Sequence, residues 1–232
     1  MALAPGDTNE AFIREVDENL RRSQAEDFFR RWGVWVIGGA LLLLAALAAF
    51  LFWRNQQAEQ AAEQSEKLAA VISDIGTGNT RTVQQRLAEI QAQGTDQFAG
   101  LAKMTGAAFA LQTGDRAKAI AAYREVAADG DQPQPLRDAA LLRGTALEFD
   151  SLKPEEVIAR LQPLAKPESG WFGSAAELTA MAMLKQNRRS EAGRLFAAIA
   201  ARDDVPGSIK SRALQIAGTL GVDASAQLPG AQ

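Results

Sequence analysis

Carboxylates are the main candidates for acid–base chemistry in this chain of 232 residues, because it contains no histidine and no cysteine. Imidazole–nucleophile pairs, thiolate chemistry and imidazole metal ligands are therefore excluded. The acids that lie closest together in the chain form three groups: Glu155-Glu156, Asp203-Asp204, and Asp129 with Asp131. All three groups lie at expected helix starts or turns, where capping and the helix dipole favour acids. We therefore predict a protein that is not an enzyme and has no catalytic residue, metal or cofactor.

An uncharged stretch of 22 residues, from 32 to 53, lies between two arginines. As a helix it would be about 33 Å long, which matches the roughly 30 Å thickness of a bilayer's hydrocarbon core. Tryptophan and arginine side chains favour the headgroup layer, and they stand at both ends of the stretch. The expected interface residues are Arg30, Arg31, Trp32, Trp35, Trp53 and Arg54. The stretch predicts one transmembrane helix in the lipid bilayer.

A cleaved signal peptide is the alternative interpretation, because Ala46-Leu47-Ala48 has the small-x-small form of a cleavage site. Two features favour an anchor instead. The 31 residues before the stretch contain seven acids, whereas a signal peptide begins with a short basic segment. The apolar run also continues from Ala48 to Trp53, where a cleaved signal would become polar.

Lysines and arginines near the span predict its orientation. Residues 12–31 carry five of them and residues 54–73 carry two, which places the N-terminal segment 1–31 in the cytoplasm and the C-terminal part outside it. From residue 55 onward the chain has 19 Lys and Arg and 21 Asp and Glu. This near balance offers no basic surface, so nucleic acid is not an expected partner.

The part after the span is rich in alanine, and its glycines and prolines fall between helical segments. This pattern predicts an all-α domain over residues 54–222, followed by a disordered tail over 223–232. The first helix is expected to continue from the span to Ser73, and a second helix over 80–93 is expected to end at Gly94 as a C′ glycine. The apolar stripe predicted at the end of the first helix consists of Leu68, Val71, Ile72 and Ile75.

Two segments of this domain match each other. The segment LQTGDRAKAIAAYREV (111–126) recurs 73 residues later as LKQNRRSEAGRLFAAI (184–199), and a third copy lies between them, around residues 157–165. The spacings of 38 and 35 residues, with two helices per unit, predict degenerate tetratricopeptide-type repeats that end in a helix near 207–221. A generic alanine-rich bundle is the alternative. The matched apolar positions are Ala119 with Ala192, Tyr123 with Phe196, and Val126 with Ile199.

The order of parts carries a family resemblance. The segment FIREVDENLRRSQAEDFFRRWG is followed by one span, the junction FWRNQQ, a helix with QQAEQAAE, and degenerate repeats. Over residues 12–222 this order resembles the ancillary SecYEG translocon subunit family, the YfgM-like proteins of didermal bacteria. The resemblance implies an inner-membrane anchor, a periplasmic repeat domain, and association with SecYEG and with a membrane-anchored periplasmic chaperone of the prolyl-isomerase class. The implied function is to help exported polypeptides reach periplasmic folding factors, and the family supplies no catalytic residues.

Stacked hairpins expose a concave face, lined mainly by the first helix of each pair, that can hold a segment of a partner. Side chains on first helices without an evident core role are the candidate contacts. They are Gln97, Lys103, Gln112, Arg137, Arg143, Trp171 and Met181. A structural role stays open for these residues: solvated charges for Lys103 and Arg137, a packing contact for Trp171, and core burial for Met181.

Two other functions stay open from the sequence. Repeats do not specify their partner, so the chain could be a cell-envelope adaptor for division or outer-membrane assembly. Alternatively, the cytoplasmic segment carries the function, because Phe12, Ile13, Val16 and Leu20 form a short amphipathic stripe that a cytosolic regulator could bind.

Overall fold

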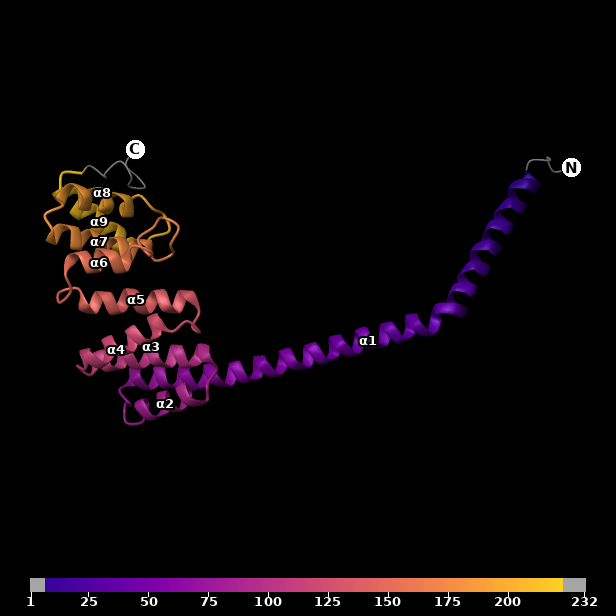
Figure 1. Ribbon diagram of the computed structural model, residues 1–232, viewed down its shortest axis with the longest axis horizontal. Coiled ribbons are helices and arrows are strands. Elements are labelled where there is room, and N and C mark those ends of the chain that lie inside the picture. Colours follow the sequence, from indigo (N-terminus) through magenta and orange to yellow (C-terminus); the bar gives the residue numbers. More distant parts are fainter. Residues whose placement is uncertain (1–6, 223–232) are drawn as a thin grey trace. The chain divides into compact units, whose positions relative to one another are not determined.

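A computed structural model describes the backbone of residues 7–222 and the side chains of residues 30–222. The predicted tail over 223–232 and the side chains of the cytoplasmic stripe lie outside the described residues. Within residues 7–222 the chain forms nine α-helices and no strand, which confirms the predicted all-α class (Figure 1). The helices are α1 (Asp7–Thr77), α2 (Val83–Gln93), α3 (Asp96–Gln112), α4 (Arg116–Ala128), α5 (Gln134–Glu148), α6 (Pro154–Leu161), α7 (Phe172–Lys185), α8 (Arg189–Ala200) and α9 (Gly207–Thr219).

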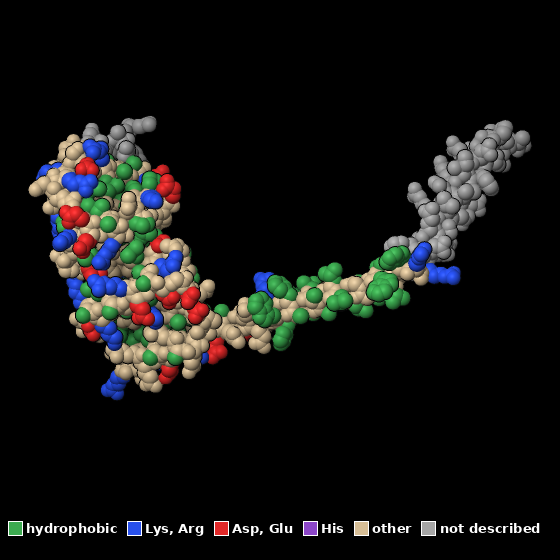
Figure 2. Space-filling model, in the orientation of Figure 1, with side chains coloured by type: hydrophobic (Ala, Val, Ile, Leu, Met, Phe, Trp, Pro, Cys, Tyr) green, Lys and Arg blue, Asp and Glu red, His purple; other side chains and the backbone are tan. Residues whose placement is uncertain are grey.

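The chain divides into two structural units between Ala62 and Glu63. In the first unit, α1 is the one helix among the described residues that is long and apolar enough to cross a membrane. Its large hydrophobic side chains from Trp32 to Trp53 are between 46% and 83% exposed, so they have no protein core to pack against. Figure 2 shows these side chains around the helix, with basic side chains at both ends of the stretch.

The second unit consists of helices that pair in chain order (Figure 1). The end of α1 packs with α2, α3 with α4, and α7 with α8, while α9 closes the array against α7 and α8. The short helix α6 packs more against α7 than against α5. Pro133 and Pro206 precede α5 and α9 with φ near −55°, a value that suits the start of a helix.

The turn inside a hairpin needs a left-handed residue, and two copies of the repeat supply it differently. Gly114 (φ 88°) follows α3 and Asn187 (φ 60°) follows α7, at matched positions of the repeat. In both turns the next backbone N–H donates to a helix carbonyl five residues back: Asp115 to Ala110 (2.8 Å) and Arg188 to Met183 (3.0 Å). Glycine and asparagine are the residues that adopt this conformation most readily at a helix end.

The core consists of four clusters in series. They lie between α1, α2 and α3, between α3, α4 and α5, between α5, α6 and α7, and between α7, α8 and α9. One residue from each shows how completely they are buried: Val71, Tyr123, Leu161 and Phe196 are at most 3% exposed. The matched apolar positions of α4 and α8 are all core positions, and Ala119, Ala192, Val126 and Ile199 are at most 1% exposed.

Two local expectations differ from the structure. Ile72 belongs to the predicted apolar stripe of α1, but it is 52% exposed, while its neighbour Val71 is fully buried. Gly94 ends α2 in an extended conformation (φ −74°) rather than as a left-handed C′ glycine. A Cβ at this position would lie 2.5 Å from the carbonyl oxygen of Ile90, so steric space explains this glycine.

A candidate partner-binding groove

A groove of about 430 Å³ lies across the first helices of three consecutive hairpins, α1, α3 and α5. We call it the groove, and it is lined by Ile72, Ile75, Leu101, Met104, Thr105, Ala108, Phe109, Gln112, Leu136, Ala139 and Arg143. On α3 its residues recur at three- and four-residue intervals, as the single face of a helix requires. These are the helices that the sequence predicts to line a concave binding face.

The groove exposes large hydrophobic side chains. In the second unit only four such side chains are exposed among the described residues: Ile72, Leu101, Leu111 and Met181. Ile72 (52%) and Leu101 (39%) line the groove, and Met181 (39%) lies on α7, another first helix. Hydrophobic side chains that gather in an exposed concave surface are typical of sites that bind another protein.

Arg143 is the one charged residue in the groove's lining. It is exposed, and it has no ion-pair or hydrogen-bond partner among the described residues. The hydroxyl of Thr105 donates to the carbonyl of Leu101 (2.9 Å), so it is occupied within α3. The groove therefore combines an apolar floor with one available guanidinium group.

The acids that could do acid–base chemistry lie outside the groove, and several of them have local partners. Glu155 accepts from Gln186 (2.8 Å), and hydrogen bonds from its own backbone N–H and from Gln186 hold the pKa of its carboxyl below the ordinary value. Arg202 donates to Asp204 (2.6 and 2.8 Å) and lowers the pKa of that carboxyl. Within residues 30–222 no group of three or more acids could hold a metal ion. These contacts fit helix capping and surface ion pairing.

The chain matches the family model of the tetratricopeptide repeat-like domain over residues 26–216. It belongs to that family. No characterised protein and no solved structure matches it significantly. Domains of this family are protein–protein interaction scaffolds and are typically non-catalytic, which agrees with an exposed apolar groove on the first helices.

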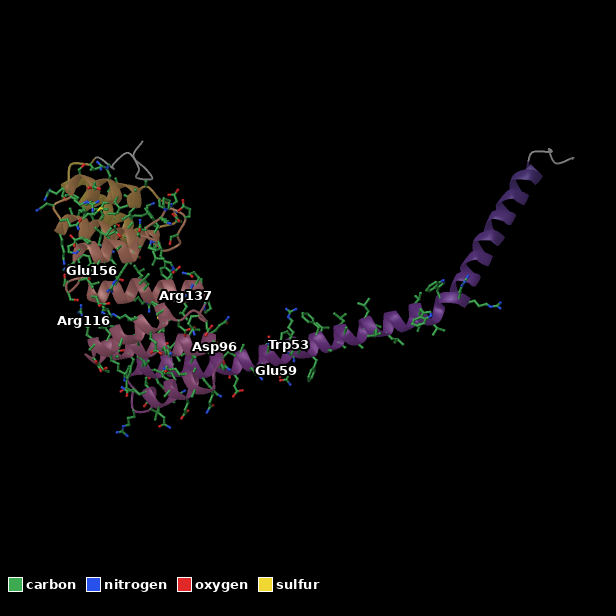
Figure 3. All side chains as sticks on the ribbon, viewed as in Figure 1. Trp53, Glu59, Asp96, Arg116, Arg137 and Glu156 are labelled. Atoms are coloured by element: carbon green, nitrogen blue, oxygen red, sulfur yellow. The ribbon has the colours of Figure 1, made fainter. Side chains whose placement is uncertain are left out.

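The tetratricopeptide repeat-like domain brings two of the candidate contacts together, since Gln112 and Arg143 both line the groove. Gln97 is exposed in the first turn of α3. Arg137, labelled in Figure 3, is half-buried at the start of α5 and donates to the side chain of Gln134. Met181 is exposed on α7 and is not a core residue.

Two candidates have structural partners within the protein. Lys103 forms an ion pair with Glu125 of α4 and lines a separate hollow between α2, α3 and α4. Trp171 is half-buried and packs against two neighbouring core clusters, while its backbone N–H donates to Ser169 (3.1 Å).

The membrane-interface candidates Trp32, Trp35 and Trp53 are all more than half exposed on α1.

Sequence reasoning missed Ile72 and Leu101 as contact residues. The register of the repeat contains the signal for Ile72, because the apolar positions of α2 and α4 match at a spacing of 36 residues. With the same offset Ile72 aligns with Ala108, and with the 73-residue offset Ala108 aligns with Met181. An isoleucine at a position held elsewhere by exposed side chains indicates a surface residue.

Proposed function

We propose that this protein is a non-catalytic scaffold anchored in the bacterial inner membrane, with residues 1–31 in the cytoplasm, 32–53 in the bilayer and 54–222 in the periplasm. It is an accessory of the SecYEG translocon. Its groove binds partner proteins or emerging exported polypeptides and links them to a membrane-anchored chaperone of the prolyl-isomerase class. The observation that carries the binding function is the exposed apolar groove across α1, α3 and α5.

The groove suits transient binding of an unfolded segment. Burying the exposed part of Ile72 or Leu101 against a partner contributes roughly 1 kcal/mol each, because a full side chain of this size contributes about 1.5–3 kcal/mol. Arg143 adds a site for a partner carboxylate or backbone carbonyl. Contacts of this strength favour reversible capture. An anchor close to the channel compensates by raising the effective concentration of emerging chains.

The translocon and the chaperone are proposed from the order of parts over residues 12–222, which resembles the ancillary SecYEG subunit family. The family of tetratricopeptide repeat-like domains supports a binding scaffold but is neutral about its partner. The orientation is supported by the excess of arginine before the span.

Photocrosslinking from native membranes tests the proposal. A photoreactive residue is placed at positions 72, 101 and 143 in the groove, and at Gln85 on the exposed face of the second helix α2 as a control. We expect channel subunits and an export chaperone to be captured from the three groove positions and not from position 85, with identification by mass spectrometry.

Capture of other proteins would change the partner that we propose. Division or outer-membrane assembly proteins without any channel component would overturn the translocon accessory and leave a cell-envelope adaptor. Deletion of residues 2–27 provides a second comparison, because capture through the groove should survive it. If that deletion abolishes capture, the cytoplasmic segment carries the interaction.

A further inference from the structure

A second cavity, of about 310 Å³, lies between α4, α5 and α6 and shares no lining residue with the groove. We call it the arginine pocket. Its polar residues are Arg124, Thr145, Glu148 and Arg160, and Tyr123 and Ala127 belong to its apolar wall. The pocket is independent of the proposed function, because it uses a different face of α5.

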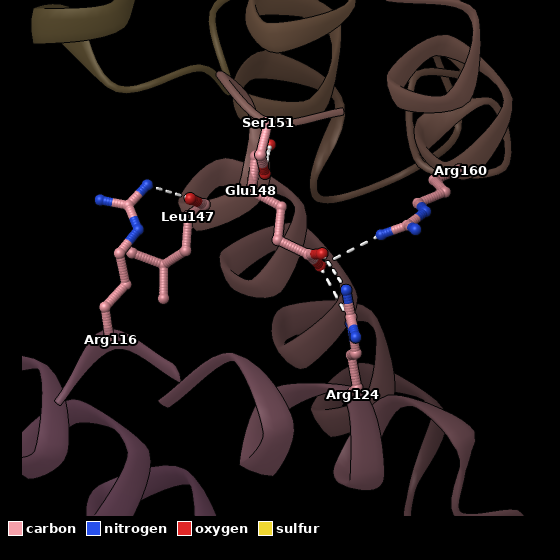
Figure 4. Close-up of polar contacts among 6 residues, drawn as sticks. All are labelled: Arg116, Arg124, Leu147, Glu148, Ser151 and Arg160. Atoms are coloured by element: carbon pink, nitrogen blue, oxygen red, sulfur yellow. Dashed lines mark hydrogen bonds and ion pairs between the residues drawn. The ribbon is translucent and has the colours of Figure 1, made fainter. Parts of the chain in front are cut away.

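The polar end of the arginine pocket carries a net positive charge. Glu148 is 4% exposed and accepts hydrogen bonds from Nε (3.2 Å) and Nη2 of Arg124 and from Nη1 of Arg160 (3.1 Å), as Figure 4 shows. Two guanidinium groups therefore surround one carboxylate. Each guanidinium has five N–H donors, and Glu148 occupies only some of them. The remaining N–H groups have no other partner among the described residues and are available to an anion.

Thr145 supplies an independent polar group beside the two arginines. It lies one turn before Glu148 on α5, is 1% exposed and lines the pocket. Its buried hydroxyl has no hydrogen-bond partner among the described residues. A helical threonine can bond back to its own helix, as Thr105 does here at 2.9 Å, whereas the buried hydroxyl of Thr179 in α7 has no partner among the described residues. A buried hydroxyl without a partner is unfavourable, so a polar ligand atom in the pocket would stabilise it.

Small residues keep the remaining wall open. Gly144 lets α4 and α5 approach, since a Cβ there would lie 3.3 Å from the Cβ of Tyr123. Ala127 and Ala140 leave space beside the tyrosine ring, and Leu141 completes an apolar wall. This part of the pocket suits an aliphatic chain and offers it no hydrogen bond.

We propose that the arginine pocket binds an aliphatic carboxylate. The apolar body of the ligand packs against Tyr123 and Ala127 of α4, and its carboxylate accepts hydrogen bonds from the spare guanidinium N–H groups and from the hydroxyl of Thr145. Two sources have this chemistry: a free short-chain acid, and the C-terminal residue of a polypeptide when that residue is aliphatic.

The sole tyrosine of the chain makes a direct test possible. Full-length protein in detergent micelles, labelled with 3-fluorotyrosine, gives one ¹⁹F resonance, and it reports on Tyr123 in the wall of the pocket. The probes are sodium hexanoate with hexanamide as its neutral counterpart, and a tetrapeptide ending in leucine, as the free acid and as the amide. We expect a saturable shift of the resonance with an acid and none with the corresponding amide.

The comparison of hexanoate with the peptide acid distinguishes a free short-chain acid from a polypeptide C-terminus. A response to hexanoate alone assigns a free acid, and tighter binding of the peptide acid assigns a chain terminus. Absence of a saturable shift with both acids, or equal shifts with the amides, overturns the proposal and leaves the arginines as a structural ion pair.

Variants tie the response to the pocket. Arg160→Gln should raise Kd about tenfold by removing a charged donor. Thr145→Val should raise it about threefold, and Ala127→Leu should abolish binding by filling the cavity without touching the ion pairs. Arg189→Gln, at an exposed arginine of α8, removes the same charge elsewhere and should leave Kd unchanged. If Ala127→Leu folds and binds as the unmodified protein does, the ligand is not in this pocket.

Discussion

Glu148 accepts hydrogen bonds from arginines of two other helices, so one buried carboxylate joins α4, α5 and α6. Burial alone would raise the pKa of this carboxyl, but the hydrogen bonds and charges of Arg124 and Arg160 outweigh burial and hold the pKa below its ordinary value. A lowered folded-state pKa stabilises the fold at every pH above the unfolded value, which is about 4.3. That stability is lost as the pH falls through the folded-state pKa.

Glu148→Gln should therefore lower the free energy of unfolding by about 2 kcal/mol at pH 7, because it removes charge-assisted hydrogen bonds from a buried site. The difference from the unmodified protein should shrink below about pH 4, where the native carboxyl becomes protonated. Chemical unfolding of the full chain in detergent, followed by circular dichroism at both pH values, measures this. Asp204→Asn, at an exposed ion pair, is the control and should change little. A difference that persists unchanged in acid would contradict the ionic explanation.

Two glycines of α3 should respond oppositely to alanine. A Cβ at Gly100 would lie 2.0 Å from Oε1 of the buried Gln132 and 2.8 Å from Leu136, so Gly100→Ala should destabilise the fold by about 1–3 kcal/mol. A Cβ at Gly106 would have only an ordinary contact, 3.7 Å from Leu87. Gly106→Ala should therefore gain helix propensity and stabilise by up to about 1 kcal/mol. Thermal unfolding of both variants compares them, and equal shifts would refute the steric account of Gly100.

At the scale of the element, α3 presents exposed leucines on two faces, and only one face belongs to the groove. Leu101→Ser should lower crosslinking from position 143 at least severalfold while leaving thermal stability nearly unchanged, because Leu101 is 39% exposed and is not needed by the core. Leu111→Ser is the matched control, since Leu111 is 40% exposed but lies outside the groove. Equal losses of crosslinking for both variants would indicate that α3 binds partners without using the groove.

The helices and the repeat register could be predicted from the sequence because each repeats a local pattern. Ala119, Tyr123 and their counterparts in α8 are buried as expected, since every hairpin must pack on the next in the same way. The face of a helix is harder to predict where two apolar residues are adjacent. Val71 packs against α2 and α3, whereas Ile72 is exposed. The positions of α2 and α3 decide which of these two apolar residues is buried.

The arginine pocket could not be predicted from any one segment. Glu148 looks like an exposed acid at the end of a helix, and its burial depends on Arg124, 24 residues before it, and Arg160, 12 residues after it. The unpaired hydroxyl of Thr145 likewise follows from how α4 packs on α5. Of the candidate contacts, Gln112 and Arg143 can be predicted because they stand on first helices, whereas the groove between those helices follows from their packing.

At the scale of the whole molecule, the proposed orientation can be tested because the chain contains no cysteine. Single cysteines at Ser23 and Ser65 would stand before and after the span. In cells with a permeabilised outer membrane, a membrane-impermeant maleimide should label Ser65→Cys at once and Ser23→Cys only after the inner membrane is disrupted. Labelling in the reverse order would overturn the orientation that the arginines predict.

The four core clusters in series have a consequence for how the second unit acquires its fold. Each cluster is formed by helices that follow one another in the chain, so no hairpin needs a distant part of the sequence before it can pack. Folds with such local contacts form quickly, and this chain needs no disulfide for its stability. The hairpins can therefore form one after another before the rest of the polypeptide has folded, each completed hairpin serving as the template for the next.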